Sequence, residues 1–327
     1  MRGEYALCFC SRLARVMRMG YGSNLGAVTL CKRKTRFRWR CGRIINFIFL
    51  SNALLFSLIK QSLPKPIRTL QFERWLDEQK VVLDGVNMVE STSATGVRGV
   101  EAVRILQKGH QVAKIPLTAM LNIEHALVDY EIGTLLKEHT WINDMFGMAL
   151  LLYRFSQRQT KWGSYLEWIP QVDETRLLRQ YPRNESTAIR TEWTKRRKFN
   201  EVLLGRLRAA RPVFFHDLTL ELLEHYVFVV QSRSFGIKVL DSAGEWHNAK
   251  CLVPFADGFN TAEQVNVACF TNAASSHFIC QTTRDVAPGD ELFVPYKSKS
   301  EVIFALNYGF SLTNQNGSTE GMSHSDL

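Results

Sequence analysis

The sequence lacks the short motifs that mark the common enzyme classes. It has no C-x-x-C pair and no H-E-x-x-H, so no zinc site can be read from it. It has no P-loop and no nucleophile elbow, and the glycines of residues 20–26 follow no predicted strand, which argues against a dinucleotide-binding loop. The eight histidines are scattered. A catalytic triad would therefore have to be assembled from residues far apart in the sequence.

Acidic side chains are almost absent from the first 72 residues, where Glu4 stands against 14 lysines and arginines. The rest of the chain has 27 basic and 30 acidic residues, so the net charge of +10 belongs to this leader. A mildly acidic body argues against a phosphate-tracking surface, and we expect no nucleic-acid partner for it. The basic run 195–198 is more typical of a solvated helix face.

The leader combines a basic run, residues 32–43, with a mostly apolar run, residues 44–59. This order is similar to a signal anchor or an organellar presequence. The apolar run is shorter than the ~20 residues of a spanning helix, and it contains Asn46 and Asn52. A cleaved targeting peptide and a misassigned translation start are the alternatives. Membrane contact is expected only through residues 44–59, and nucleus, cytoplasm, organelle and membrane all stay open as compartments.

Cysteine is sparse in the body, where Cys251, Cys269 and Cys280 are separated by eighteen and eleven residues. The other four of the seven cysteines lie in the leader. These spacings indicate no metal site, and we expect buried thiols in a reducing compartment.

Hydrophobic periodicity predicts strands at both ends of the body and helices between them. The expected strands are 86–91, 99–104, 110–116, 250–255, 266–271, 277–283 and 291–296. The expected helices are 69–79, 142–155, about 199–210, one capped by Asp217 that ends near 232, and 300–310 capped by Ser298 or Ser300. Strands, then helices, then strands again favour an α+β fold over a doubly wound one.

Five segments of the body carry a family resemblance when taken in order: residues 96–116, 162–170, 232–235, 253–267 and 289–310. Together they resemble the SET-domain protein methyltransferases, in particular the branch similar to Rubisco large-subunit methyltransferase. The resemblance covers about residues 70–310 and implies a β-rich SET domain of small sheets with an inserted helical subdomain. It divides the chain into a leader (1–65), an N-terminal SET part (66–122), a helical insert (123–231), a C-terminal SET part (232–310) and a polar tail (311–327).

The resemblance also implies S-adenosylmethionine as cofactor, a protein as substrate, and a role for each of ten residues. Tyr296 would be catalytic, and Phe235 and Tyr308 would line the substrate channel. The cofactor would contact Val97, Arg98, Gly99, Arg233, Asn260, Thr261 and Phe310. Each residue has a purely structural alternative: Arg233 as a helix cap, Asn260 and Asn266 as turn residues, the tyrosines as packing.

Two positions depart from the family, because Thr261 stands where histidine is usual and Lys297 where glycine is usual. Relatives also continue into a C-terminal helical lobe, which we expect to be missing here. We therefore expect a slow enzyme, which Thr261→His with Lys297→Gly would accelerate. Two functions stay open: N-methylation of a protein lysine, with histidine as another acceptor, and a weak or inactive SET-fold protein that binds a protein or the cofactor.

Overall fold

The computed structural model divides the chain into two units, Met1–Pro64 and Lys65–Leu327, and describes part of the second. The described residues are 65–92, 94–95, 97–180, 186–240, 244–272, 276–298 and 300–311. The expectations for the leader, including residues 44–59, and for the tail beyond 311 fall outside them. Within these ranges no helix is both long and apolar enough to cross a bilayer.

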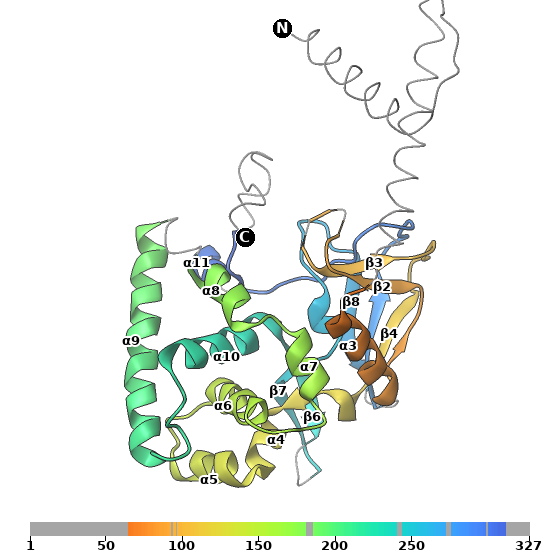
Figure 1. Ribbon diagram of the computed structural model, residues 1–327. Coiled ribbons are helices and arrows are strands. Elements are labelled where there is room, and N and C mark those ends of the chain that lie inside the picture. The colour runs from red at the N-terminus through yellow and green to blue at the C-terminus, as the bar shows by residue number, and fades with distance from the viewer. Residues whose placement is uncertain are drawn as a thin grey trace, which may run out of the picture. The chain divides into compact units, whose positions relative to one another are not determined.

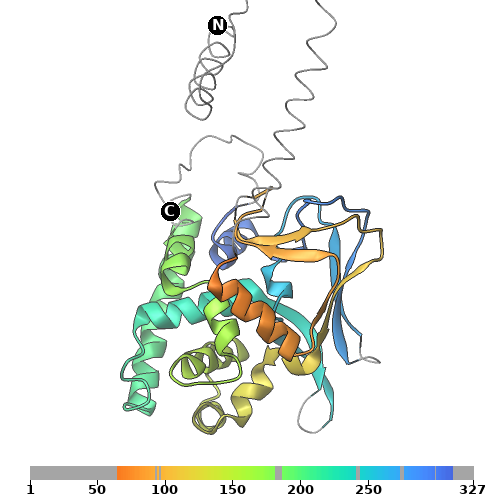
Figure 2. The same cartoon turned by 45° about the vertical axis from the view of Figure 1, so that its right-hand side comes forward.

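In the second unit small antiparallel sheets lie on one side and most of the helices on the other (Figures 1 and 2). One sheet has the order β1-β4-β9-β8, formed by Val82–Leu83, Gln111–Pro116, His277–Thr282 and Val267–Asn272. The second pairs β2 (Val86–Val89) with β3 (Gly99–Ala102). The third has the order β5-β7-β6, formed by Leu121–Asn122, Trp246–Leu252 and Ser234–Leu240. This arrangement confirms the α+β prediction.

Seven helices lie between β5 and β6 in the described chain. They are α4 (Ile123–Val128), α5 (Tyr130–Glu138), α6 (Asp144–Ser156), α7 (Gly163–Trp168), α8 (Val172–Gln180), α9 (Thr187–Ala210) and α10 (Leu220–Arg233). Helix α3 (Ile67–Glu78) precedes the strands and α11 (Glu301–Tyr308) follows them, while Leu117–Ala119 and Ala256–Gly258 form the short 3₁₀ turns η1 and η3. Polar caps fix several starts: the Ser300 hydroxyl, for example, accepts a hydrogen bond from the Ile303 amide, as expected for α11.

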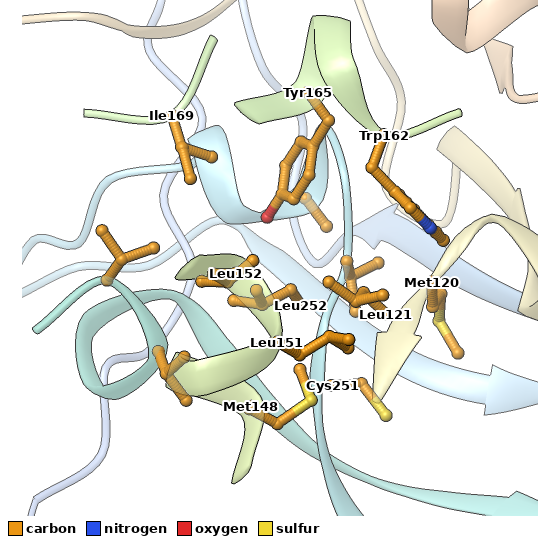
Figure 3. Packing of buried hydrophobic residues seen from close by; sticks show 14 of the residues in the cluster. Met120, Leu121, Met148, Leu151, Leu152, Trp162, Tyr165, Ile169, Cys251 and Leu252 are labelled. Carbon is orange, nitrogen blue, oxygen red and sulfur yellow. The ribbon is translucent and has the colours of Figure 1, made fainter. Parts of the chain in front are cut away.

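The core joins the helices to the sheets around α6. Nine of the thirteen α6 residues are buried, because the run from Phe146 to Phe155 is apolar on nearly every face. Figure 3 shows this packing, with Met148, Leu151 and Leu152 of α6 meeting side chains of β5 and β7, and with Tyr165 of α7 reaching into the cluster. Burial on this scale makes α6 and β7 a rigid support for the loop that follows β7.

Two sequence expectations about local structure are wrong, and one strand was missed. The N-cap of α10 is Thr219, whose hydroxyl accepts from the Leu222 amide, and not Asp217. Residues 291–296 form only isolated bridges, at Glu291 and Phe293. Strand β6 was missed, although Phe235, Ile237 and Val239 alternate with small or polar residues as in a half-buried strand.

The cysteines also differ from expectation. Cys269 and Cys280 stand opposite each other in the β8–β9 register and form a disulfide, while Cys251 is free and buried. Antiparallel pairing brought together two residues that sequence spacing alone could not connect.

Candidate functional site

The site is organised by residues 290–294, which run between β3 and the loop 260–267. The Leu292 amide donates to the Val100 carbonyl at 2.8 Å, and the Val294 amide donates to the Asn260 carbonyl at 2.9 Å. Asn266 holds the same segment with both ends of its amide: Nδ2 donates to the Glu291 carbonyl at 2.9 Å, and Oδ1 accepts from the Phe293 amide at 2.7 Å. Asn266 is therefore a structural residue.

Glu291 is a buried carboxylate that the sequence did not single out. Its side chain accepts hydrogen bonds from the Thr92 hydroxyl at 2.5 Å, from the Asn260 amide at 2.7 Å and from the Thr95 hydroxyl at 3.1 Å. A Cβ at Gly99 would lie 2.7 Å from Glu291 Oε1 and 2.8 Å from Asn260 Nδ2, so only glycine fits there. The glycine thus accommodates Glu291, whereas the resemblance had explained it by the cofactor.

Asn260 also binds the turn before β3, because its Nδ2 donates to the Arg98 carbonyl at 3.0 Å. This contact joins two segments about 160 residues apart that the resemblance assigns to cofactor binding. Val97 beside it is about half exposed, and Gly96 lies outside the described residues. The backbone of residues 97–99 is therefore fixed against the Asn260 loop.

Two arginines meet at Trp168, the last residue of α7. The Arg98 guanidinium donates to the Trp168 carbonyl at 2.6 Å and lies 4.7 Å from the centre of its ring. Arg233, at the end of α10, lies 5.9 Å from the same ring, which stacks on Phe72 at 4.3 Å. Burial, together with the charge of Arg233, lowers the pKa of Arg98 to about 10, so the Arg98 guanidinium stays charged at neutral pH.

Asp257 supplies a buried negative charge to this pair. The turn that carries it begins at Phe255, whose φ of 74° and ψ of −53° give the strained geometry of a γ-turn. Asp257 Oδ2 accepts from the Tyr165 hydroxyl at 2.7 Å and lies 3.8 Å from Arg233, which also donates to the Asp257 carbonyl at 2.7 Å. Oδ1 has no hydrogen-bond partner among the described residues, and burial raises the pKa of Asp257 to about 6.

Tyr296 lies at the end of the organising segment. Its hydroxyl donates to the Phe259 carbonyl at 2.8 Å, and its backbone amide donates to the Thr261 hydroxyl at 3.3 Å. Its ring stacks on Tyr308 at 4.5 Å with an interplanar angle of 25°. Burial raises the pKa of Tyr296 above its ordinary value, so this phenol stays protonated in the physiological range.

Several solved structures match this arrangement. The SET domain of LSMT bound to MeLysine and AdoHcy aligns with a TM-score of 0.62 at 19% identity, over 77% of this chain and 59% of that one. Rubisco LSMT bound to Sinefungin and Monomethyllysine aligns with a TM-score of 0.58 at 20% identity, over 80% and 61%. The chain has the SET-domain fold. No family model and no curated protein matches it in sequence, and it spans about three fifths of those structures.

Within the SET fold, the two departures from the family pattern have local explanations. Thr261 is 5% exposed, and its hydroxyl holds the backbone of Tyr296. Lys297 is exposed to solvent, and it is not among the described non-glycine residues with positive φ, which are Lys80, Phe255 and Ser276. Lysine therefore costs no left-handed strain at 297, and its charge is screened by water.

The remaining expected residues of the SET site fall into two groups. Tyr308 donates to the Lys297 carbonyl at 3.3 Å and stacks on Tyr296, while the Phe310 ring lies 6.5 Å from Tyr308 at the same helix end. Phe235, in contrast, packs its ring on Phe278 at 5.3 Å, and no ring contact joins it to Tyr296 or Tyr308 in the described chain. The Tyr296–Tyr308 stack, with ring centres 4.5 Å apart, leaves no room for an alkyl chain between the rings.

The chemistry that these groups can perform is binding and orientation. Among the described residues no cluster of three histidine, cysteine or acidic side chains could hold a metal ion. The site offers two guanidiniums, one buried carboxylate without a full set of partners, and a neutral phenol. Glu291, Asp257 and Trp168 were missed from the sequence, and the only signal was that each lies inside a segment already compared with the family.

Proposed function

We propose that this protein is an S-adenosylmethionine-dependent methyltransferase that methylates a lysine side chain of a protein substrate. The observation that carries the proposal is the meeting of Arg98, Arg233 and Asp257 beside the loop of Asn260 and Tyr296. The structures that share the fold carry AdoMet, AdoHcy or lysine derivatives by name, which supports the same ligands here.

The residues present fit the amino-acid end of such a cofactor. A carboxylate needs a planar fork of donors, which Arg233 offers and Arg98 reinforces with a second positive charge. The carboxylate of Asp257 offsets one of the two positive charges of Arg98 and Arg233. Its Oδ1 is buried without a hydrogen-bond partner in the described chain and can accept from a donor of the ligand. Asn260 fixes the neighbouring backbone of Arg98. When bound, the cofactor supplies a methyl group that is already activated for displacement.

The role of Tyr296 follows from its hydrogen bond. Its proton is directed to the Phe259 carbonyl, so the oxygen lone pairs are free to accept from a lysine N–H and orient the amine. Because burial raises its pKa, the phenol does not ionise and does not compete as a nucleophile. A free lysine titrates near ~10.4 and must lose a proton first, which an apolar, cation-bearing site favours.

Titration calorimetry of the full chain with S-adenosylmethionine and S-adenosylhomocysteine tests the proposal. We expect binding by the wild type, and Arg233→Ala should weaken it by about 1.5–3 kcal/mol, the scale of a charged hydrogen bond. Arg206→Ala is the matched control, because Arg206 lies over Trp141 and outside the site. Absence of binding by the wild type at millimolar cofactor would refute the proposal. Binding without methyl transfer to any protein would favour the binding-module alternative.

A further inference from the structure

A cavity of about 1150 Å³ lies in the helical part of the described chain and contains none of the site residues above. Helices α6, α8, α9, α10 and α11 surround it. Its volume exceeds the ~300–1,000 Å³ of ordinary small-molecule pockets. Part of its lining is apolar, from Met145 and Phe146 of α6, Val227 and Phe228 of α10 and Leu306 of α11.

Helix α9 lies along this cavity, and Trp193 of its middle part packs only partly against the cluster of Ile189, Ala305 and Leu306. At one end Ile189 packs on Ala305 and Leu306, and at the other Leu203 and Leu207 join the main core. None of the residues 190–199 between them is buried. Phe199 lies 5.5 Å from Phe146 and is still 53% exposed, where periodicity predicted a core position. Both views show α9 at the outer edge of the helices (Figures 1 and 2).

Positive charge exceeds negative charge on the cavity wall. Glu192, Glu221 and Glu224 are the acidic lining residues, and the basic ones are Arg176, Arg179, Lys195, Arg196 and Arg197. Glu221 pairs with Arg176 at 2.5 Å, Glu224 pairs with both Arg179 and Arg197, and Glu192 lies 3.7 Å from Arg196 and 3.9 Å from Lys195. Among the lining residues five basic side chains thus share three acidic ones, although the chain beyond residue 72 carries more acidic than basic residues. Such a concave basic surface attracts anionic groups.

The cavity shares a wall with the candidate active site. Leu306 lines the cavity, and the Arg196 guanidinium donates to the Asn307 side chain at 2.9 Å. The next residue, Tyr308, stacks on Tyr296. A segment bound under α9 would therefore contact the helix that carries one of the two site tyrosines.

We propose that this cavity docks an acidic, partly apolar segment of the protein that is methylated, at a distance along its chain from the target lysine. The apolar side chains of the segment would lie on the exposed ring of Phe199, and its carboxylates would face Lys195 and the neighbouring arginines. The mixed lining favours such a segment over a small anion, because an apolar floor contributes nothing to a small anion. The inference rests on the proposed function for the identity of the partner.

The probe is a fluorescein-labelled peptide of about 15 residues, with glutamates and leucines at helical spacing around one lysine. Its affinity for the full chain is measured by fluorescence anisotropy without cofactor. Lys195→Glu should weaken binding about five- to tenfold, because it replaces an attraction by a repulsion at the rim. Lys198→Glu is the matched control: the same charge change on the same helix, exposed and outside the cavity lining. A peptide with glutamine for every glutamate should lose most of its affinity.

Three results would overturn the docking proposal. Equal effects of Lys195→Glu and Lys198→Glu would show that the cavity is not the binding place. Equal binding of a peptide with alanine for every leucine would indicate a simple anion site. Displacement of the peptide by millimolar citrate as effectively as by unlabelled peptide would also indicate a simple anion site. The binding assay contains no cofactor, so it is independent of the proposed function. If the wild type binds the peptide in a Lys195-dependent way but transfers no methyl group to any protein, the proposed function is refuted and the docking of an acidic segment still stands.

Discussion

Asp257→Asn tests the electrostatics of the site. The substitution keeps an oxygen that can accept from the Tyr165 hydroxyl and removes one charge that is fully buried. Burial raises the pKa of this carboxyl from 3.8 to about 6, a shift of about two pH units. At 1.36 kcal/mol per unit the buried charge costs about 3 kcal/mol of unfolding free energy once it is fully ionised.

The direction of the pH dependence follows from the raised pKa. The stability of the wild type is undiminished by this group below about pH 4 and falls as the pH rises through 6, where the folded protein must ionise it. The variant has no carboxyl to ionise at this position. Its unfolding free energy relative to that of the wild type should therefore increase by about 3 kcal/mol between pH 4 and pH 7. The difference between the unfolding free energies of the two proteins removes the contributions of the other titrating groups, which both proteins share.

Urea unfolding of both proteins at a series of pH values measures this difference. Asp77→Asn, at an exposed position of α3, controls for the loss of one carboxylate. A variant that is less stable than the wild type by the same amount at every pH would refute the reasoning. So would a deficit that widens as the pH rises, because the pair with Arg233 would then outweigh the cost of burial.

Four further substitutions test the site. Tyr296→Phe should leave the melting temperature nearly unchanged and lower methyl transfer about 10²-fold, since only the aligning hydroxyl is lost; equal activity would end its catalytic assignment. Glu291→Gln should cost about 1.5–3 kcal/mol in urea unfolding and weaken cofactor binding, because its amide group would oppose the Asn260 donor; unchanged values would contradict this. Thr261→His should slow transfer and lower stability, opposite to the expectation from the family pattern, while Lys297→Gly should change neither; an accelerated Thr261→His variant would restore that expectation.

The sequence predicted the order of strands and helices because their patterning is local. The periodicity of α3 and the serine before α11 were sufficient for those helices. It failed where tertiary contacts decide. Phe199 reads as a core residue from its spacing and yet faces the cavity, and Cys269 meets Cys280 only through strand pairing.

The site shows the same division. Resemblance singled out Arg233, Asn260 and Tyr296, and the structure places them around one loop, although their roles remain proposals. It gave no reason to choose Asp257 or Glu291, because a buried carboxylate is recognised by its burial and its donors, which a single sequence does not display.

The placement of residues 290–294 between β3 and the Asn260 loop bears on how the protein is made. Contacts such as Leu292 to Val100 join residues nearly two hundred positions apart, and chain entropy delays such contacts relative to local ones. During synthesis, β3 and helices α3 to α10 leave the ribosome long before this segment exists. A nascent chain would therefore contain Arg98, Arg233 and Trp168 before it contains Tyr296 and Tyr308. Binding of the proposed cofactor should begin only when synthesis has passed Tyr308.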